Sequence, residues 1–343
     1  MQIEQVELHN SQLRVTLLTF GASIRSVEMP DKSGVLGPVH LSLDSLEQYL
    51  DPGLNPSLGA SVGRYANRIA GARFLIDDEE VLLTPNEGGN QLHGGPKGFG
   101  RCNWDLWSHE ASPAGGVAKF GFNSPDGDQG FPGNLSVVAE YELIDDTLRV
   151  TYSATTDAPT VVNLTNHGYW NLDGASTVHG HALAIRADRV LPVHANGLPA
   201  GPLTPVVNTP FDLRRRTSVR AALAALPTGF DHAYEIRGAS DLGRASGLPG
   251  ESVALCDAAV LDSEASGRWI CFRTNQPAVQ VYTGNGLGPP FQQHGAICLE
   301  TQRFPDTPNH PELGSAALLP NEQYCSVTEL QFGVGEPPEL AGL

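Results

Sequence analysis

The fold is indicated most clearly by the stretch NLSVVAEYELIDDTLRVTYSA, residues 134–154. Its first half is rich in apolar and β-branched residues, and in its second half Leu148, Val150 and Tyr152 recur at a strict period of two. Alternation at this period places successive side chains on opposite faces of an extended strand. Two such runs joined by Asp145-Asp146 predict a β-hairpin.

Strand character extends outward from this hairpin. Residues 12–27 and 268–282 have similar patterns, the second interrupted by Gln276-Pro277. The chain holds 38 glycines and 26 prolines, together about a fifth of its residues against an average near 12%. Turns are therefore expected to be frequent and helices few.

Only two stretches have a helical pattern. One is residues 43–50, with Ser42 as a candidate cap, and the other is residues 218–226. Because strands do not alternate with helices, a doubly wound fold is not expected. The sequence predicts one all-β domain over residues 1–343, a large antiparallel β-sandwich with few short helices, whose loops carry the functional site.

The charge balance argues against some classes of partner. There are 21 Lys and Arg against 38 Asp and Glu, a formal net charge of −17. Nucleic-acid binding requires a basic face, so no nucleic-acid partner is expected.

No apolar run approaches the roughly 20 residues of a membrane span, and the N-terminus has no signal-peptide pattern. With five scattered cysteines read as reduced thiols, we expect a cytoplasmic protein; the oligomeric state is not evident from the sequence.

Five short segments combine glycine, asparagine or aromatic residues with a group that can move a proton or bind a hydroxyl. Such loops present polar groups to small polar ligands. The candidates are Asn67 and Arg68 in residues 63–71, His93 in 90–95, His167 in 165–171, Asp231 in 229–234 and Glu300 in 295–302.

Glu300 is the most informative of these residues. It follows the apolar run Ile297-Cys298-Leu299, which places a carboxylate at the edge of a core, where an unpaired charge is costly. A single histidine in a glycine-rich loop is more often structural. The pair His179 and His181 lacks further ligands at a recognised spacing, so no metal site is expected.

Taken together and in this order, the segments resemble the aldose 1-epimerase (galactose mutarotase) family. The phrases that carry the resemblance are Asn67-Arg68-Ile69, Gln91-Leu92-His93-Gly94-Gly95, Thr165-Asn166-His167-Gly168-Tyr169, Phe230-Asp231-His232, Cys298-Leu299-Glu300-Thr301-Gln302, residues 124–134 and residues 279–285. One departure is Trp170 after Tyr169, where members commonly carry phenylalanine.

The resemblance implies a β-sandwich with an open cleft and an enzyme that interconverts the α and β anomers of a free aldose, without cofactor or metal. It implies that Glu300 takes the proton of the anomeric hydroxyl and that His167 protonates the ring oxygen. By the same resemblance His93 shares the work of the acid. Arg68, Asp231 and Gln280 then hold sugar hydroxyls, and Asn67 supports them.

Ordinary pKa values of about 4.3 for glutamate and 6.5 for histidine would leave the base ionised and the acid protonated between them. A nearby carboxylate is expected to raise the pKa of His167. Three alternatives stay open: a hexose-6-phosphate epimerase using Arg64 or Arg214–Arg216, a glycoside hydrolase using Asp231 and Glu300, and a sugar-binding protein without activity. The preferred aldose is also open.

Overall fold

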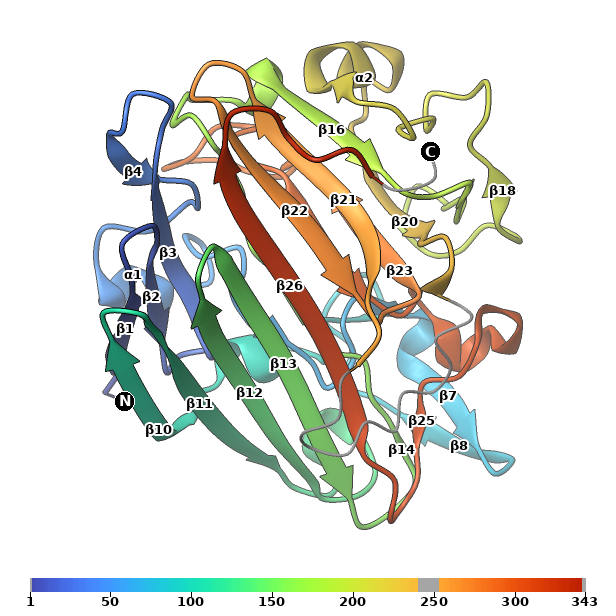
Figure 1. Cartoon of the computed structure of the whole chain (residues 1–343). Coiled ribbons are helices and arrows are strands. Elements are labelled where there is room, and N and C mark those ends of the chain that lie inside the picture. The colour runs from blue at the N-terminus through green and yellow to red at the C-terminus, as the bar shows by residue number, and fades with distance from the viewer. Residues whose placement is uncertain (1, 240–252, 341–343) are drawn as a thin grey trace.

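The computed structural model describes residues 2–239 and 253–340. Its largest feature is a nine-stranded antiparallel sheet that forms the front layer in Figure 1. In spatial order its strands are β10 (Asp105–Ser112), β11 (Gly115–Ser124), β12 (Leu135–Ile144), β13 (Thr147–Thr156), β26 (Tyr324–Val334), β22 (Arg268–Thr274), β21 (Cys256–Ser263), β16 (His181–Ile185) and β19 (Thr217–Ser218).

Two smaller antiparallel sheets pack against this large sheet. The first contains β1 (Gln5–His9), β2 (Arg14–Leu18), β3 (Ser23–Pro30) and β4 (Leu36–Pro38). The second has the order β18 (Thr204–Pro205), β17 (Arg189–Val190), β20 (Asp231–Glu235), β23 (Ala278–Tyr282) and β24 (Cys298–Gln302). Side chains from all three sheets share one hydrophobic core, so the predicted antiparallel β-sandwich is confirmed.

Four two-stranded pairs, two short α-helices and several single-turn 3-10 helices complete the described elements. The pairs are β5 (Ser61–Val62) with β15 (Thr165–Asn166), β6 (Arg68–Ile69) with β9 (Gln91–Leu92), β7 (Arg73–Ile76) with β8 (Glu79–Leu82), and β14 (Thr160–Val161) with β25 (Ala317–Leu318). The α-helices are α1 (Leu46–Tyr49) and α2 (Val219–Ala225). Neither helix has the length or apolar composition that a membrane crossing requires.

The predicted elements agree with this structure except in their bounds. The hairpin is β12 and β13, paired from Leu135↔Thr156 to Ile144↔Thr147. Residues 12–27 form two strands, because the backbone turns at Gly21 and Ala22 with φ of 67° and 41°. Residues 268–282 divide at the predicted interruption, and their halves β22 and β23 belong to different sheets.

The two predicted helices differ in how well their bounds were placed. Helix α2 matches the expected range to within one residue at each end. Helix α1 begins later than expected, because Ser45 and not Ser42 is its N-cap. The backbone N–H of Ser45 donates to Gln48 Oε1 at 3.1 Å, which fixes the start of this single turn.

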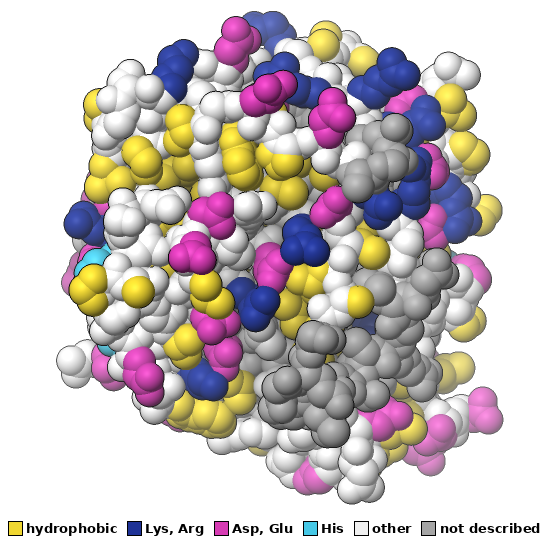
Figure 2. Space-filling view, viewed as in Figure 1, with side chains coloured by type: hydrophobic (Ala, Val, Ile, Leu, Met, Phe, Trp, Pro, Cys, Tyr) yellow, Lys and Arg dark blue, Asp and Glu magenta, His cyan; other side chains and the backbone are white. Residues whose placement is uncertain are grey.

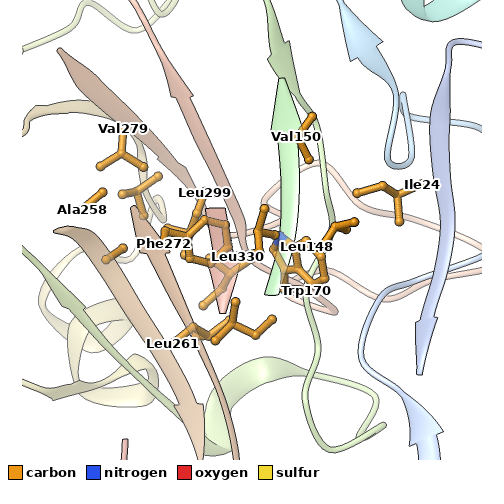
Figure 3. Close-up of a cluster of buried hydrophobic side chains, with 14 of the residues drawn as sticks. Ile24, Leu148, Val150, Trp170, Ala258, Leu261, Phe272, Val279, Leu299 and Leu330 are labelled. Atoms are coloured by element: carbon orange, nitrogen blue, oxygen red, sulfur yellow. The ribbon is translucent and has the colours of Figure 1, made fainter. Parts of the chain in front are cut away.

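The core lies between the sheets and uses one face of each strand. Figure 3 shows Val279 of β23 and Leu299 of β24 facing Phe272 and Leu330 of the large sheet. Because side chains alternate along a strand, the residues on either side of Leu299 point away from this core. One of these is Glu300, so the core fixes the face of β24 on which Glu300 lies.

The middle of the outer face of the large sheet is polar, and a small apolar cluster of Ala184, Val260, Cys271, Trp269 and Leu340 lies on the same face. Figure 2 shows acidic and basic side chains interspersed over the middle of this face. They include cross-strand pairs such as Lys119 with Glu140, whose Nζ and Oε2 are 2.6 Å apart, and Arg149 and Arg273 with Glu329. Water on this face and apolar packing on the other set the register of the strands.

Trp170 joins several parts of the core, and we predict that its removal is costly. Its ring is 1% exposed and lies 6.1 Å from Phe272, 5.9 Å from Phe332 and 5.2 Å from His40 between ring centroids. Trp170→Ala is expected to lower the free energy of unfolding by roughly 3–5 kcal/mol, measured by denaturant titration.

The matched control is Trp107→Ala, because Trp107 is 52% exposed on the outside of the sheet. This variant is expected to lose about 1 kcal/mol or less of its free energy of unfolding. Equal losses for the two variants would contradict the assignment of Trp170 to the core.

Candidate active site

Glu300 lies in the middle of β24 and is almost completely buried, with 2% of its surface exposed. Its cross-strand partner on β23 is Gln280, and Gln280 is paired in turn with Ala233 on β20. The Gln280 amide donates from Nε2 to Asp231 Oδ1 at 2.6 Å. The five-stranded sheet therefore places two carboxylates and an amide on the face that points away from the core.

His167 approaches Glu300 from the other side. It follows β15, and backbone hydrogen bonds fix it on both sides: its N–H donates to Ala60 O at 2.8 Å, and its carbonyl accepts from Gly59 N at 2.9 Å. Its ring stacks on Tyr169, with centroids 4.9 Å apart and planes 14° apart. His167 Nε2 is 3.9 Å from Glu300 Oε1, which is too long for a direct hydrogen bond.

His93 lies edge-on to His167, with ring centroids 5.3 Å apart. The His93 ring accepts a hydrogen bond on Nδ1 from the backbone N–H of Asn67 at 3.1 Å. The backbone N–H of His93 donates in return to Asn67 O at 3.1 Å. A neutral histidine that accepts at Nδ1 must carry its proton on Nε2. His93 is therefore a donor with a fixed orientation.

Asn67 forms a sharp bend beside His93, with φ of 65°, and its Oδ1 accepts the backbone N–H of Arg68 at 2.8 Å. This bend aims the Arg68 side chain at the site. Arg68 Nη1 is 3.7 Å from Asp231 Oδ2. All seven residues expected at the site therefore lie in one connected cluster: Asn67, Arg68, His93, His167, Asp231, Gln280 and Glu300.

Glu87 contacts this cluster through Arg68, and sequence reasoning missed it. Its carboxylate accepts from Arg68 Nε at 2.6 Å and from Arg68 Nη2 at 2.9 Å. The only feature of the sequence that could have linked Glu87 to the site was its position six residues before His93, in the same asparagine- and glycine-rich loop. An acidic residue in such a loop is usually solvated, and its contact with Arg68 arises because β6, which contains Arg68, pairs with β9, the strand that follows this loop; that pairing cannot be read from the sequence.

The protonation states differ from those expected. Burial lowers the pKa of His167 to about 4, so the expected rise is wrong: desolvation of the imidazolium outweighs the backbone hydrogen bond that opposes it. Burial raises the pKa of Glu300 to about 8, with Asp231 adding to the rise and Arg68 opposing it. Burial and the positive charges of His167 and Arg68 hold the pKa of His93 well below its usual value.

Three of the arginines that a sugar phosphate could use have partners elsewhere in the structure. Arg64 is buried and donates to the carbonyls of Pro132 and Gly133 at 2.8 and 3.0 Å. Arg214 pairs with Asp212 at 2.7 Å, and Arg216 pairs with Asp262. Of the arginines named as candidates, only Arg68 lies at the site.

The described residues contain no group of three or more His, Cys, Asp or Glu side chains arranged to hold a metal ion. His181, considered above as a metal ligand, instead accepts the backbone N–H of Leu172 on Nε2 at 2.8 Å. Trp170, the departure from the family pattern, points into the core, whereas the neighbouring Tyr169 stacks on His167.

Comparison with known proteins finds relatives that match almost the whole chain. The family model described as aldose 1-epimerase matches residues 4–331. The chain is 39% identical to the aldose 1-epimerase of Escherichia coli K12 over 340 residues, which covers 94% of this chain and 93% of that protein. It is 37% identical to the galactose mutarotase of Bos taurus, covering 97% and 94% of the two chains.

Solved structures show the same similarity. An aldose epimerase homologue from C. elegans superposes with a TM-score of 0.86 at 27% identity and covers 98% of this chain and 100% of its own. Galactose 1-epimerase from Lactobacillus acidophilus superposes with a TM-score of 0.81 at 27% identity, with the same coverage of both chains. From the matches in sequence and in structure, the chain belongs to the aldose 1-epimerase family and is an isomerase.

Proposed function

We propose that the chain interconverts the α and β anomers of a free aldose, with Glu300 and His167 moving the two protons. The observation that carries this proposal is the buried pair itself. His167 Nε2 and Glu300 Oε1 are 3.9 Å apart, and Glu300 Oε2 has no hydrogen-bond partner among the described residues. The anomeric hydroxyl and the ring oxygen share one carbon atom, so a base and an acid that serve them must lie this close.

Ring opening requires two proton transfers, one from the sugar to Glu300 and one from His167 to the sugar. The Glu300 carboxylate takes the proton of the anomeric hydroxyl, and the C1–O5 bond breaks as the His167 imidazolium protonates the ring oxygen. The products are an aldehyde, a protonated Glu300 and a neutral His167. Rotation about C1–C2 then turns the other face of the aldehyde to the O5 hydroxyl, and closure returns both protons.

This cycle requires that the pair hold one proton in total. With the pKa of His167 near 4 and that of Glu300 near 8, the free pair rests as neutral imidazole and carboxylic acid. The reactive arrangement carries the same single proton on the histidine. Burial thus favours neutral His167 with protonated Glu300, which is also the state reached after ring opening. Hydrogen bonds from the bound sugar are expected to favour the reactive state, in which His167 is protonated and Glu300 is ionised.

His93 is better suited to hydrogen bonding than to proton transfer. Its pKa lies well below the usual value, and its Nδ1 is occupied by the Asn67 N–H. We therefore assign it a neutral Nε2–H that donates to the ring oxygen, in place of the shared acid role expected from the sequence. Such a donor stabilises charge that develops on that oxygen.

The remaining residues are proposed to hold the sugar hydroxyls. Arg68 Nη1 and the Asp231 carboxylate face each other across 3.7 Å, and Gln280 Oε1 has no partner among the described residues. One cationic donor, one acceptor and one amide can together bind adjacent hydroxyl groups. Asn67 acts on Arg68 and His93 through its backbone and Oδ1. Because Arg64, Arg214 and Arg216 have partners elsewhere, we propose a free rather than a phosphorylated aldose as substrate.

The first prediction concerns Glu300→Gln. The amide keeps the shape of the side chain and cannot accept the anomeric proton, so kcat is expected to fall by about 10²–10⁴ with KM little changed. Polarimetry of freshly dissolved α-D-glucose and α-D-galactose measures the rate, corrected for catalysis by the buffer.

The matched control is Glu80→Gln, which makes the same change at an exposed pair with Arg73 outside the site, where Nη1 and Oε1 are 3.3 Å apart. It is expected to keep the parental rate. If the parent chain failed to accelerate mutarotation of glucose, galactose, xylose and arabinose, the proposed function would be wrong. Normal turnover of Glu300→Gln would refute the assigned base.

The second prediction is a bell-shaped dependence of kcat/KM on pH. Below about pH 4 both groups are protonated and no base remains, whereas above about pH 8 neither is protonated and no acid remains. The acidic limb therefore belongs to His167 and the alkaline limb to Glu300, the reverse of the order that ordinary pKa values give. A flat profile from pH 4 to 9, or an alkaline limb unmoved in Asp231→Asn, which removes a charge that raises the pKa of Glu300, would contradict the assignment.

A further inference from the structure

The Arg68 guanidinium is held by an acidic residue that does not belong to the sugar-facing cluster. Glu87 accepts from Nε at 2.6 Å and from Nη2 at 2.9 Å, a two-point pairing that fixes the plane of the guanidinium. The remaining nitrogen, Nη1, faces Asp231 Oδ2 at 3.7 Å. Glu87 thereby determines which donor of Arg68 points to the site.

A glycine covers the flat face of the same group. Gly197 lies in the turn between β17 and β18 with φ of +76°, and a Cβ atom on it would come within 2.6 Å of Arg68 Cζ. Only a residue without a side chain allows the backbone to approach this closely. The guanidinium is therefore held along one edge by Glu87 and over one face by the backbone at Gly197.

The loop that carries Glu87 also carries His93. Asn86 closes this loop, since its side chain accepts the Leu92 N–H at 2.7 Å and donates to Leu92 O at 3.0 Å. Glu87 and Asn90 exchange two backbone hydrogen bonds inside it, at 3.1 and 2.8 Å. One closed loop thus sets the position of Glu87 relative to the ring of His93.

We propose that Glu87 is a positioning residue for sugar binding, acting through Arg68 by occupying Nε and Nη2 so that Nη1 alone is presented to the substrate. This inference rests on the proposed function of Arg68. Without Glu87 the freed guanidinium can close on Asp231, only 3.7 Å away, and form a pair that withdraws both groups from the sugar. Asp231 is the nearest alternative partner, and Glu300 and His93 are the other titratable groups within the electrostatic reach of Arg68.

The test is a double-mutant cycle with Glu87→Ala and Arg68→Ala, measured by polarimetry over a range of sugar concentrations. Glu87→Ala is expected to lower kcat/KM by about 10- to 100-fold, mainly through KM, because a misplaced binding group weakens substrate and transition state alike. In the Arg68→Ala background the same change is expected to have no further effect, since Glu87 then has no partner through which to act. Glu87→Gln, which keeps one acceptor oxygen, is expected to fall between the parent and Glu87→Ala.

Glu80→Ala is the matched control, because it removes the acidic partner of Arg73 on the exposed β7–β8 hairpin, and it is expected to leave kcat and KM unchanged. Additive losses in the cycle, or Glu87→Ala behaving like Glu80→Ala, would overturn the positioning role. If circular dichroism shows that Glu87→Ala does not fold, Glu87→Gln tests the positioning role in its place. Glu300→Gln measured in parallel keeps the two proposals distinguishable, because its low kcat supports the proposed function whatever the cycle shows.

Discussion

The burial of one carboxyl group, Glu300, is the constraint on which the account of this site depends. Strand β24 turns Leu299 into the core and Glu300 to the opposite face, where packing leaves it 2% exposed. A carboxylate taken out of water without full compensation holds a proton more tightly. In the proposed mechanism, that property lets Glu300 receive a proton from a hydroxyl group and return it within the same catalytic cycle.

The remaining charges adjust this group without removing its burial. Asp231 raises the pKa of Glu300 further and Arg68 lowers it, while Glu87 keeps Arg68 from closing on Asp231. His167, equally buried, shifts in the opposite direction, so the pair holds a single proton across the neutral range. In the proposed mechanism, the sandwich thus supplies a buried face on which an acidic group, Glu300, and a basic group, His167, exchange that proton through the sugar.

Local patterns in the sequence predicted the strands and most of the site. Alternation identified β12 and β13, the apolar run before Glu300 placed a carboxylate at the core edge, and family phrases brought the seven site residues together. The role of Glu87 was not predictable, because its contact with Arg68 depends on the pairing of two short strands, β6 and β9, that are far apart in the sequence. The protonation states were also wrong from sequence, since a residue's type gives its ordinary pKa and only the folded surroundings give its desolvation.

The most direct test is to titrate the side-chain carboxyl of Glu300 in the free protein. Side-chain carboxyl carbons of glutamate, labelled with ¹³C, would be followed by NMR from about pH 5 to 9, with Glu300→Gln used to assign the signal. The Glu300 resonance, absent from that variant, is expected to remain in the carboxylic-acid form at pH 6 and to ionise near pH 8. A Glu300 signal that is already fully ionised at pH 6 would contradict the claim that burial governs the chemistry of this site.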